Sequence, residues 1–166
     1  MREGLICTAS WDHTLRVVDP SSGECLQVFT GHTDKVVHVT QLQDGSMCSS
    51  SIDCTIRIWR WQPLQPLLVL RGHTQNARWV VQLDGHRLCS CSKDRTLRVW
   101  DISPSLSPST TSSSSVISEA APPEEQRQAR TEKVVTGHED YVRCVTLLRD
   151  GRLLSGSDDC TMRLWS

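Results

Sequence analysis

Short apolar runs separated by turn residues fill most of the chain. Between residues 35 and 71 four such runs follow one another: KVVHVTQL, SMCSSS, CTIRIW and LLVLR. Each run is too short for a helix, and together they are rich in valine, isoleucine and threonine, which favours β-strands. A turn signal, Asp44-Gly45, separates the first two runs as in a hairpin. The pattern predicts four-stranded antiparallel sheets and an all-β fold.

The alternation within the runs indicates that both faces of each sheet are covered. In TLRVW, residues 96–100, Leu97 and Val99 point to one face of the strand, whereas Thr96 and Trp100 point to the other. Large apolar side chains therefore lie on both sides of the same strand. We expect each sheet to be packed between two neighbouring sheets.

A ten-residue phrase recurs along the chain. Its copies are SWDHTLRVVD from Ser10, SIDCTIRIWR from Ser51, SKDRTLRVWD from Ser92 and SDDCTMRLWS from Ser157. The first three copies lie 41 residues apart. A Gly-His pair at Gly31, Gly72 and Gly137 repeats the interval of 41 residues and then widens it to 65, which places a 24-residue insertion between Trp100 and Gly137. A period near 40 residues is typical of stacked structural repeats.

These markers, in the order Gly-His, Asp-Gly and S-x-D-x-T-[LIM]-R-[VIL]-W, resemble those of the WD-repeat family of β-propellers. The resemblance implies blades of four antiparallel strands, lettered a (innermost) to d (outermost). Counted this way, the chain holds strands b-c-d, a-b-c-d, a-b-c-d and a-b-c, an incomplete ring of about three and a half blades. Blades 1 to 3 occupy 1–101, and 134–166 supply the last strand of blade 3 and blade 4.

The segment 102–133 is rich in serine, threonine and proline and then becomes charged. Such a composition buries little apolar surface, so we expect a disordered insertion between strands c and d of blade 3. Ser103 and Ser107 each precede a proline, which is the pattern of proline-directed phosphorylation. An inert spacer is the alternative interpretation of this segment.

Propellers close with about 4 to 8 blades, so this chain is at or below the lower limit. We therefore expect further blades in a longer chain, a truncated gene product, or self-association of two half-rings. Alone, the chain should expose blade faces and strand edges and tend to associate.

The resemblance also implies a hydrogen-bonded chain of histidine, serine, aspartate and tryptophan inside each blade. The matching sets are His32, Ser51, Asp53 and Trp59; His73, Ser92, Asp94 and Trp100; and His138, Ser157, Asp159 and Trp165. An ionised carboxylate accepts protons from imidazole and hydroxyl groups, and these in turn offer an acceptor to the indole N–H. The first phrase has Val18 in the tryptophan position and no preceding Gly-His pair, so we expect no such chain there.

Histidine, serine and aspartate also form the catalytic triad of hydrolases. A catalytic triad is built once, at one cleft, whereas this composition occurs three times at the repeat period and without a G-x-S-x-G motif. We interpret the sets as structural and predict no enzymatic activity. The alternative, a hydrolase, predicts that Ser51, Ser92 or Ser157 reacts with a fluorophosphonate.

Positions whose residue type differs from one copy of the repeat to the next are those where a partner could be recognised. These positions precede each phrase aspartate or follow each Gly-His pair, and by resemblance they lie on the face that carries the d-to-a and b-to-c turns. The candidates are Trp11, Lys35, Ile52, Asn76, Arg78, Lys93, Tyr141 and Asp158. Aromatic and arginine side chains dominate binding hot spots, which favours Trp11, Arg78 and Tyr141; a half-buried Trp11 is the alternative. The implied function is a scaffold or adaptor that binds proteins or peptides, or, more narrowly, the substrate-recognition subunit of a ubiquitin ligase.

Charge and cysteine content narrow the partners further. Eighteen basic and nineteen acidic residues give a net charge of -1, so neither nucleic acid nor an anionic membrane is expected to bind. No apolar stretch approaches the roughly 20 residues that cross a bilayer. The eight cysteines largely follow the repeat, which indicates free thiols in a reducing compartment rather than disulfides or a metal site. We expect an intracellular protein, cytoplasmic or nuclear, without cofactor or metal.

Overall fold

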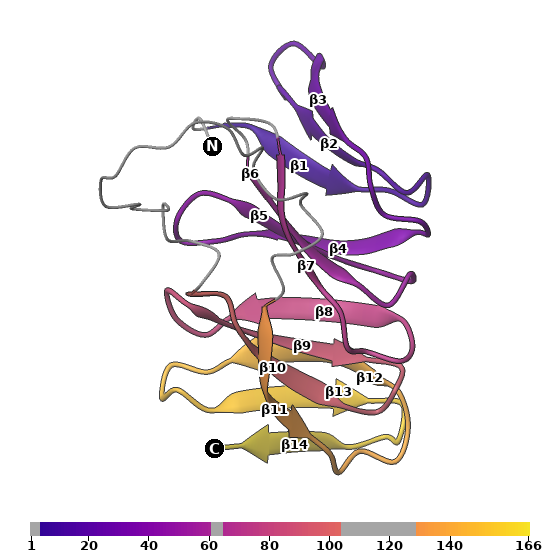
Figure 1. Ribbon diagram of the computed structural model, residues 1–166, viewed down its shortest axis with the longest axis vertical. Helices are drawn as coiled ribbons and strands as arrows, with labels where there is room; N and C mark the ends of the chain where they lie inside the picture. Colours follow the sequence, from indigo (N-terminus) through magenta and orange to yellow (C-terminus); the bar gives the residue numbers. More distant parts are fainter. Residues whose placement is uncertain (1–3, 61–64, 104–128) are drawn as a thin grey trace, which may run out of the picture.

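The computed structural model describes residues 4–60, 65–103 and 129–166, and the structural statements below concern these residues. They form four antiparallel sheets, which confirms the all-β fold (Figure 1). Sheet 1 comprises β1 (Ile6–Ala9), β2 (Leu15–Val18) and β3 (Cys25–Phe29). Sheet 2 comprises β4 (Val36–Gln41), β5 (Met47–Ser51), β6 (Ile56–Arg60) and β7 (Gln65–Leu70). Sheet 3 comprises β8 (Ala77–Gln82), β9 (Arg87–Ser92), β10 (Leu97–Asp101) and β11 (Arg130–Val135), and sheet 4 comprises β12 (Val142–Leu147), β13 (Leu153–Ser157) and β14 (Met162–Trp165).

Each sheet is a meander in which consecutive strands are neighbours, so the strand order b-c-d, a-b-c-d, a-b-c-d, a-b-c is confirmed. The sheets lie one after another along the longest axis of the molecule, with sheet 1 at one end and sheet 4 at the other (Figure 1). They do not close into a ring among the described residues. Adjacent sheets meet mainly through their inner strands: β1 contacts β4, β4 contacts β8, and β8 contacts β12.

Apolar side chains fill the three interfaces between adjacent sheets. Sheets 1 and 2 share a cluster that includes Leu15, Val17 and Trp59. Further clusters join sheet 2 to sheet 3 and sheet 3 to sheet 4. Leu97 and Trp100, which point to opposite faces of β10, are 1% and 0% exposed. The expectation that both faces of a sheet are buried is therefore confirmed for the inner sheets.

The two end sheets each leave one face open. Met162 and Leu164 in β14 are 76% and 47% exposed, whereas the equivalent Leu97 and Val99 in β10 are 1% and 9% exposed, and Leu97 packs in the cluster that joins sheet 3 to sheet 4. Ile6 at the other end of the molecule is 50% exposed. The repeat therefore continues to place apolar side chains on faces that no described sheet covers.

The expected insertion 102–133 is shorter than predicted at both ends. Ile102 is fully buried and its N–H donates to the carbonyl of His86 at 2.8 Å. Residues Arg130 to Lys133 belong to β11, which pairs with β10. The sequence RTEKVV looks polar because an outermost strand is held by backbone hydrogen bonds and needs few apolar side chains. Residues 104–128, including Ser107, lie outside the described residues.

All eight cysteines carry free thiols. Cys48, Cys89 and Cys91 are buried, whereas Cys25, Cys144 and Cys160 are exposed. No group of three or more histidine, cysteine or acidic side chains within the described part of the chain has the arrangement of a metal site. The same part contains no helix long and apolar enough to cross a membrane.

Candidate functional site

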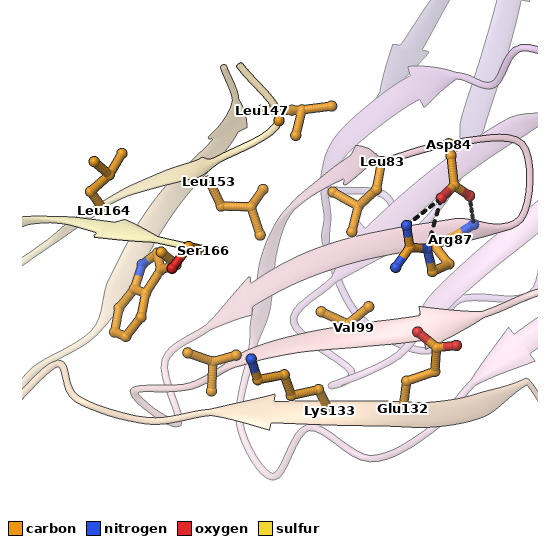
Figure 2. A pocket seen from close by; sticks show the side chains of 13 residues that line it. Leu83, Asp84, Arg87, Val99, Glu132, Lys133, Leu147, Leu153, Leu164 and Ser166 are labelled. Carbon is orange, nitrogen blue, oxygen red and sulfur yellow. Dashed lines mark hydrogen bonds and ion pairs between the residues drawn. The ribbon is translucent and has the colours of Figure 1, made fainter. Parts of the chain in front are cut away.

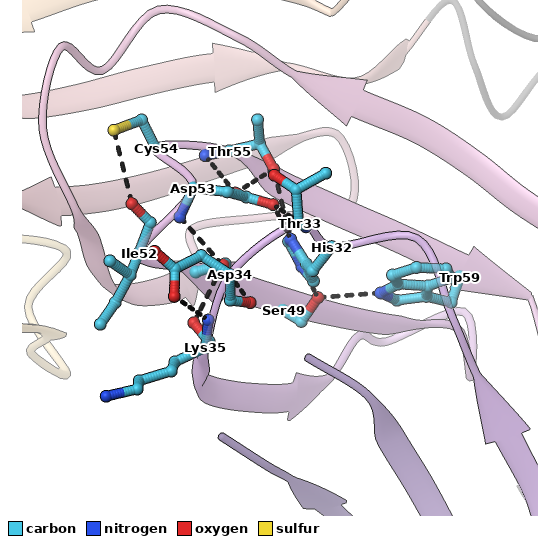
Figure 3. Close-up of polar contacts among 11 residues, drawn as sticks. His32, Thr33, Asp34, Lys35, Ser49, Ile52, Asp53, Cys54, Thr55 and Trp59 are labelled. Carbon is cyan, nitrogen blue, oxygen red and sulfur yellow. Dashed lines mark hydrogen bonds and ion pairs between the residues drawn. The ribbon is translucent and has the colours of Figure 1, made fainter. Parts of the chain in front are cut away.

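A buried polar chain runs through sheet 2 from tryptophan to aspartate (Figure 3). The indole Nε1–H of Trp59 donates to Ser49 Oγ at 2.8 Å, and the same oxygen lies 2.8 Å from His32 Nε2. On the other side of the imidazole ring, His32 Nδ1 lies 2.7 Å from Asp53 Oδ2. Sheets 3 and 4 repeat the chain at the same distances, through Trp100, Ser90, His73 and Asp94 and through Trp165, Ser155, His138 and Asp159.

The donors and acceptors of this chain assign its protons. An ionised aspartate only accepts, so His32 carries its proton on Nδ1 and donates it to Asp53. The Nε2 atom of a neutral imidazole is then an acceptor, and the hydroxyl of Ser49 donates to it. The serine oxygen in turn accepts the indole proton of Trp59. Every polar atom of the chain therefore has a partner although the serine is fully buried.

The serine that completes the chain differs from the predicted one: the assignments of Ser51, Ser92 and Ser157 to the tryptophan and histidine are wrong. Ser51 instead donates to the carbonyl of Lys35 at 2.9 Å and accepts the backbone N–H of Asp53 at 3.1 Å. Ser49 and Ser51 are two residues apart and share one face of β5, so alternation alone could not separate them. Ser51 lies about 7 Å further along the strand, at the turn. The signal that could have identified Ser49, Ser90 and Ser155 is that their column is serine only in the three copies that carry the tryptophan, whereas the first copy has Thr8 there but keeps Ser10 in the other column.

The turn aspartate anchors the phrase through both carboxylate oxygens. Besides His32, Asp53 accepts the backbone N–H groups of Thr33 and Thr55 at 3.0 and 2.9 Å and the hydroxyl of Thr55 at 2.6 Å. Burial disfavours the ionised form, but the hydrogen bonds from His32 and Thr55 outweigh burial and hold the pKa of Asp53 well below its usual range. The threonine of the phrase thus donates hydrogen bonds to the carboxylate through its hydroxyl and its backbone N–H, a role that the sequence interpretation missed.

The glycine of each Gly-His pair makes room for the chain. At Gly31, where φ is 146°, a Cβ atom would lie 2.8 Å from a guanidinium nitrogen of Arg57 and 3.2 Å from the ring of Trp59. Gly137 has the same backbone conformation and would bring a Cβ atom within 3.0 Å of Trp165. The left-handed φ and the adjacent indole ring both require glycine at these positions.

Sheet 1 holds its turn in another way. Asp12 accepts the hydroxyl of Thr14 at 2.6 Å and a guanidinium N–H of Arg16 at 2.8 Å. Hydrogen bonds from Thr14 and Ser10 lower the pKa of Asp12 to about 2. In sheet 1 the turn aspartate is therefore bonded to Arg16, whereas in sheets 2 to 4 the equivalent aspartate is bonded to a histidine.

Ser49, His32 and Asp53 have the contact distances of a hydrolase triad, but the serine is not placed to react. Ser49 and Ser90 are 0% exposed and Ser155 is 1% exposed. Each of these oxygens also accepts an indole proton, which occupies a lone pair that an attacking nucleophile would need. Ser51, Ser92 and Ser157, the nucleophiles of the hydrolase alternative, bond to turn backbone instead. The geometry gives the three sets a structural role.

Most of the predicted partner-binding residues fall into two groups of contacting residues at the turns, Trp11, Lys35 and Ile52 in one and Asn76, Lys93, Tyr141 and Asp158 in the other. The N–H of Ile52 donates to the carbonyl of Lys35, that of Lys93 to Asn76, and that of Asp158 to Tyr141, at 2.9 to 3.0 Å. The ammonium group of Lys35 lies 4.3 Å from the ring centre of Trp11, and that of Lys93 lies 4.6 Å from the ring centre of Tyr141. Cation–π contacts therefore link the turns of sheet 1 to those of sheet 2 and the turns of sheet 3 to those of sheet 4.

A hollow of about 430 Å³ is lined by all four sheets, with aromatic and cationic side chains from sheets 1, 3 and 4 and two valines from sheet 2. It is lined by Ala9, Trp11, Val36, Val37, Arg78, Trp79 and Arg143. Trp11 is 70% exposed and Trp79 is 40% exposed, so Trp11 is not half-buried, as the alternative interpretation assumed. Arg143 donates to both carboxylate oxygens of Asp158.

Trp79 and Arg143 were missed at the sequence level. They lie on inner strands β8 and β12, which read as core strands; of the residues on these strands the prediction named only Arg78. The signal for Arg143 was its repeat position, which is that of Arg78, and the signal for Trp79 was its place next to Arg78 in the sequence. The partner-binding role of the whole set stays a prediction.

The comparison with known protein families matches the repeat units of this chain. The family described as "WD domain, G-beta repeat" matches residues 23–60, 64–101 and 129–166. No curated protein matches the chain. Among the solved structures that match is the WD40 beta propeller domain of Doa1, with a TM-score of 0.78 at 23% sequence identity. The match covers 99% of this chain and 47% of that chain, so this chain spans about half the length of that structure. At this identity the likeness establishes the fold alone.

Proposed function

Because this chain belongs to the family of WD domains with G-beta repeats, we propose that it is a protein-interaction scaffold or adaptor that binds a peptide segment of its partner on the turn-bearing face. Propellers of this family generally serve as protein-interaction scaffolds. The observation that supports the binding face is the hollow lined by Trp11, Arg78, Trp79 and Arg143. Two partly exposed indole rings and two guanidinium groups around one hollow are the side chains that dominate binding hot spots.

The buried chains prepare this face for binding. His32, His73 and His138 each tie the turn that carries Gly-His to the turn aspartate of the same sheet. The loops that carry Lys35 and Ile52 are therefore held before a partner arrives, and a preorganised surface loses less conformational entropy on binding. The scaffold role needs no reacting group.

The charges of the face favour an acidic segment. Arg78 and Arg143 line the hollow, and Arg143 is already paired with Asp158. Lys35 and Lys93 lie in the neighbouring turns, against Trp11 and Tyr141. Arg78 forms no ion pair with any described residue. A partner carboxylate would bond to Arg78, while an apolar or aromatic side chain of the same segment would pack between Trp11 and Trp79. We therefore propose a peptide that presents an acidic and a large apolar side chain close together.

A role as the substrate-recognition subunit of a ubiquitin ligase is one case of this adaptor function. No observation on the described residues favours it over other adaptor roles. Ser103 is among the residues that the structure describes. Its proposed phosphorylation likewise rests only on the proline that follows it in the sequence.

The experiment is affinity capture from cell lysate with the wild-type chain, Arg78→Glu and Arg149→Glu, followed by quantitative mass spectrometry. Arg149 is an exposed arginine in the turn after β12, at the other end of the strands, and serves as the matched charge reversal. We expect Arg149→Glu to keep the captured partner and Arg78→Glu to reduce its capture at least tenfold, a loss typical of a hot-spot arginine. Capture that is unchanged by both Arg78→Glu and Trp11→Ala would refute this binding face.

A further inference from the structure

His38 and Ser50 each bury a polar atom that has no hydrogen-bond partner. The atoms are Nδ1 of His38 and Oγ of Ser50, and the register of β4 and β5 places the two residues directly opposite each other. Residues in this relation project to the same face of their sheet, and the contact between His38 and Trp79 shows that this face is turned to sheet 3. Sheet 2 therefore carries two unpaired polar groups in an interface that apolar side chains fill.

The repeat does not require this pair. The equivalent pairs are Trp79 opposite Cys91 in sheet 3 and Cys144 opposite Gly156 in sheet 4. Among the described residues, the other buried side-chain polar atoms without a partner belong to the arginine of the phrase, namely Arg57, Arg98 and Arg163. Those three recur with the repeat, whereas the histidine occurs once, so its unpaired nitrogen calls for a local explanation.

His38 supports one wall of the hollow on the turn-bearing face. Its ring centre lies 4.0 Å from a ring centre of Trp79, and the two ring planes are inclined by 31°, which is close to a parallel stack. Trp79 lines the hollow and is 40% exposed. Its indole N–H donates to no described residue. The stack on His38 is therefore the directional contact that orients this indole.

The larger cleft between sheets 3 and 4 lacks this combination (Figure 2). It has a volume of about 640 Å³ and is lined in part by apolar side chains such as Leu83 and Val99. Asp84 and Arg87 in its wall form an ion pair at 2.7 Å. None of the described side chains that line the cleft buries an unpaired polar atom. The unpaired histidine therefore belongs to the support of the hollow and not to the cleft.

The surroundings of His38 disfavour a protonated ring. The three strands packed against β4, which are β1, β5 and β8, contain no acidic residue, and Arg78 is their only charged residue. Their thiols at Cys7 and Cys48 have pKa values raised by burial and stay neutral. Asp34, in the turn that leads into β4, accepts the next backbone N–H of the chain. A second proton would turn Nδ1 of His38 into a buried donor without an acceptor.

We propose that His38 is a positioning residue of the hollow: its neutral ring holds Trp79 in the wall, and protonation of His38 releases the indole and weakens binding at this site. His38 does not line the hollow itself and acts through Trp79. The effect on binding rests on the proposed function, whereas the coupling between His38 and Trp79 does not.

The direction of the pH dependence follows from burial. Burial lowers the pKa of His38 to about 4, below the value of about 6.5 for a solvated histidine. The stacked arrangement is therefore fully favoured above pH 6.5 and is lost as the pH falls toward 4. Attraction between an imidazolium and an indole ring offsets part of this loss, so we expect the ratio of stacked to released rings to fall by about tenfold.

The first test follows Trp79 by fluorine NMR in a chain labelled with 5-fluorotryptophan, and Trp79→Phe identifies its resonance. Between pH 7 and pH 4.5 the Trp79 resonance should shift, while that of the fully buried Trp100 stays in place and shows that the chain is folded. His38→Phe keeps a ring against Trp79 but has no titratable group, so its Trp79 resonance should stay constant. A Trp79 resonance that shifts in both chains, or in neither, would overturn the proposal.

The second test measures the reciprocal effect, which is read between pH 7 and pH 5. By linkage, loss of Trp79 must ease the protonation of His38. Proton NMR of the imidazole should show a higher pKa of His38 in Trp79→Ala than in the wild-type chain, by about tenfold in the protonation equilibrium. Trp11→Ala is the matched control, because Trp11 lines the same hollow but packs against Lys35, and it should leave the pKa of His38 unchanged. Equal pKa values of His38 in Trp79→Ala and the wild-type chain would refute the coupling.

The consequence for binding is tested on the partner that the wild-type chain captures at pH 7. A wash at pH 4.5 should elute this partner from the wild-type chain and leave it bound to His38→Phe. Equal elution from both chains would contradict a role of His38 in binding and leave the proposed binding face unaffected. Failure of capture at pH 7 would instead count against the proposed function alone, because the two NMR tests use no partner.

Discussion

Asp53 and Asp94 show how one side chain fixes a turn. Each carboxylate accepts two backbone N–H groups, a threonine hydroxyl and an imidazole, and each has a pKa well below its usual range because the hydrogen bonds outweigh burial. Removing such a carboxylate would leave several donors without a partner at once. The phrase S-x-D-x-T is therefore a single polar cluster rather than a set of independent residues.

The partly buried His38 and the buried His73 make stability fall on acidification. Burial lowers the pKa of His38 to about 4, and burial also lowers the pKa of His73 despite its bond to Asp94. Both folded-state values lie below about 6.5, the value in the unfolded chain, so their contribution is full above pH 6.5 and is lost as pH falls. Ionised Asp53 and Asp94 act in the same direction below about pH 4.

We expect the free energy of unfolding, measured in urea, to fall between pH 7 and pH 4.5. His38 should account for about 1 to 2 kcal/mol of this fall, after allowance for its partial exposure. The variant His38→Gln, which cannot gain a proton, should show a correspondingly flatter profile. An identical pH profile for His38→Gln and the wild-type chain would contradict this assignment.

The residue between the phrase aspartate and threonine adopts a left-handed backbone. His13, Cys54, Arg95 and Cys160 have φ between 62° and 72°. A non-glycine residue in this region costs about 1 to 2 kcal/mol. Because Cys160 is exposed, Cys160→Gly should raise the free energy of unfolding by about 0.5 to 1 kcal/mol, once the greater entropy of the unfolded glycine is counted.

The matched control for this prediction is Cys144→Gly, an exposed cysteine within strand β12. Glycine weakens a strand, so this variant should lose about 0.5 to 1 kcal/mol in the same urea titration. A loss of stability in both variants would show that the left-handed turn costs nothing with cysteine.

At the scale of elements, each polar chain joins separate parts of one sheet. In sheet 2 it begins at the turn before β4, which carries His32, passes through Ser49 in β5 and ends at Trp59 in β6. Asp53 closes the chain from the turn between β5 and β6. Strand order and turn conformation are therefore fixed together, which an apolar core alone would not do.

The same scale shows what sequence could and could not predict. Alternation and the recurrent phrase located the inner strands, because those strands bury side chains on both faces. The start of β11 was missed because an outer strand such as RTEKVV is defined by backbone pairing with β10. Ser49 was confused with Ser51 because period-two alternation cannot distinguish two serines on one face. The exposed Trp79 was missed because its strand, β8, otherwise reads as core.

At the scale of the whole molecule, the exposed apolar faces of sheets 1 and 4 favour association between copies of the chain. Ile6 in β1 is 50% exposed, while Met47, which has the equivalent place opposite the tryptophan position in sheet 2, is fully buried. Met162 and Leu164 form the matching open face of sheet 4. Placing sheet 4 of one molecule on sheet 1 of another would repeat the interface that already joins neighbouring sheets.

We expect the wild-type chain to show a mass above 18.6 kDa that rises with concentration in size-exclusion chromatography with light scattering. Ile6→Lys places a charge on the sheet 1 face and should shift the mass toward the monomer. Val134→Lys is the control, because Val134 is 45% exposed in an inner sheet and lies outside both end faces. A sharp monomer for the wild-type chain at all concentrations would contradict this prediction.

Buried tryptophan–serine–histidine–aspartate chains hold the sheets and so fix the turns of the face that we propose binds a partner. The measurement that tests it most directly is the free energy of unfolding of Ser90→Ala compared with Ser92→Ala in the same strand. Ser90→Ala leaves the indole N–H of Trp100 and Nε2 of His73 buried without a partner, and should cost about 2 to 4 kcal/mol. Ser92→Ala removes bonds at a partly buried turn and should cost about 1 kcal/mol. Equal losses, or a larger loss for Ser92→Ala, would contradict the account.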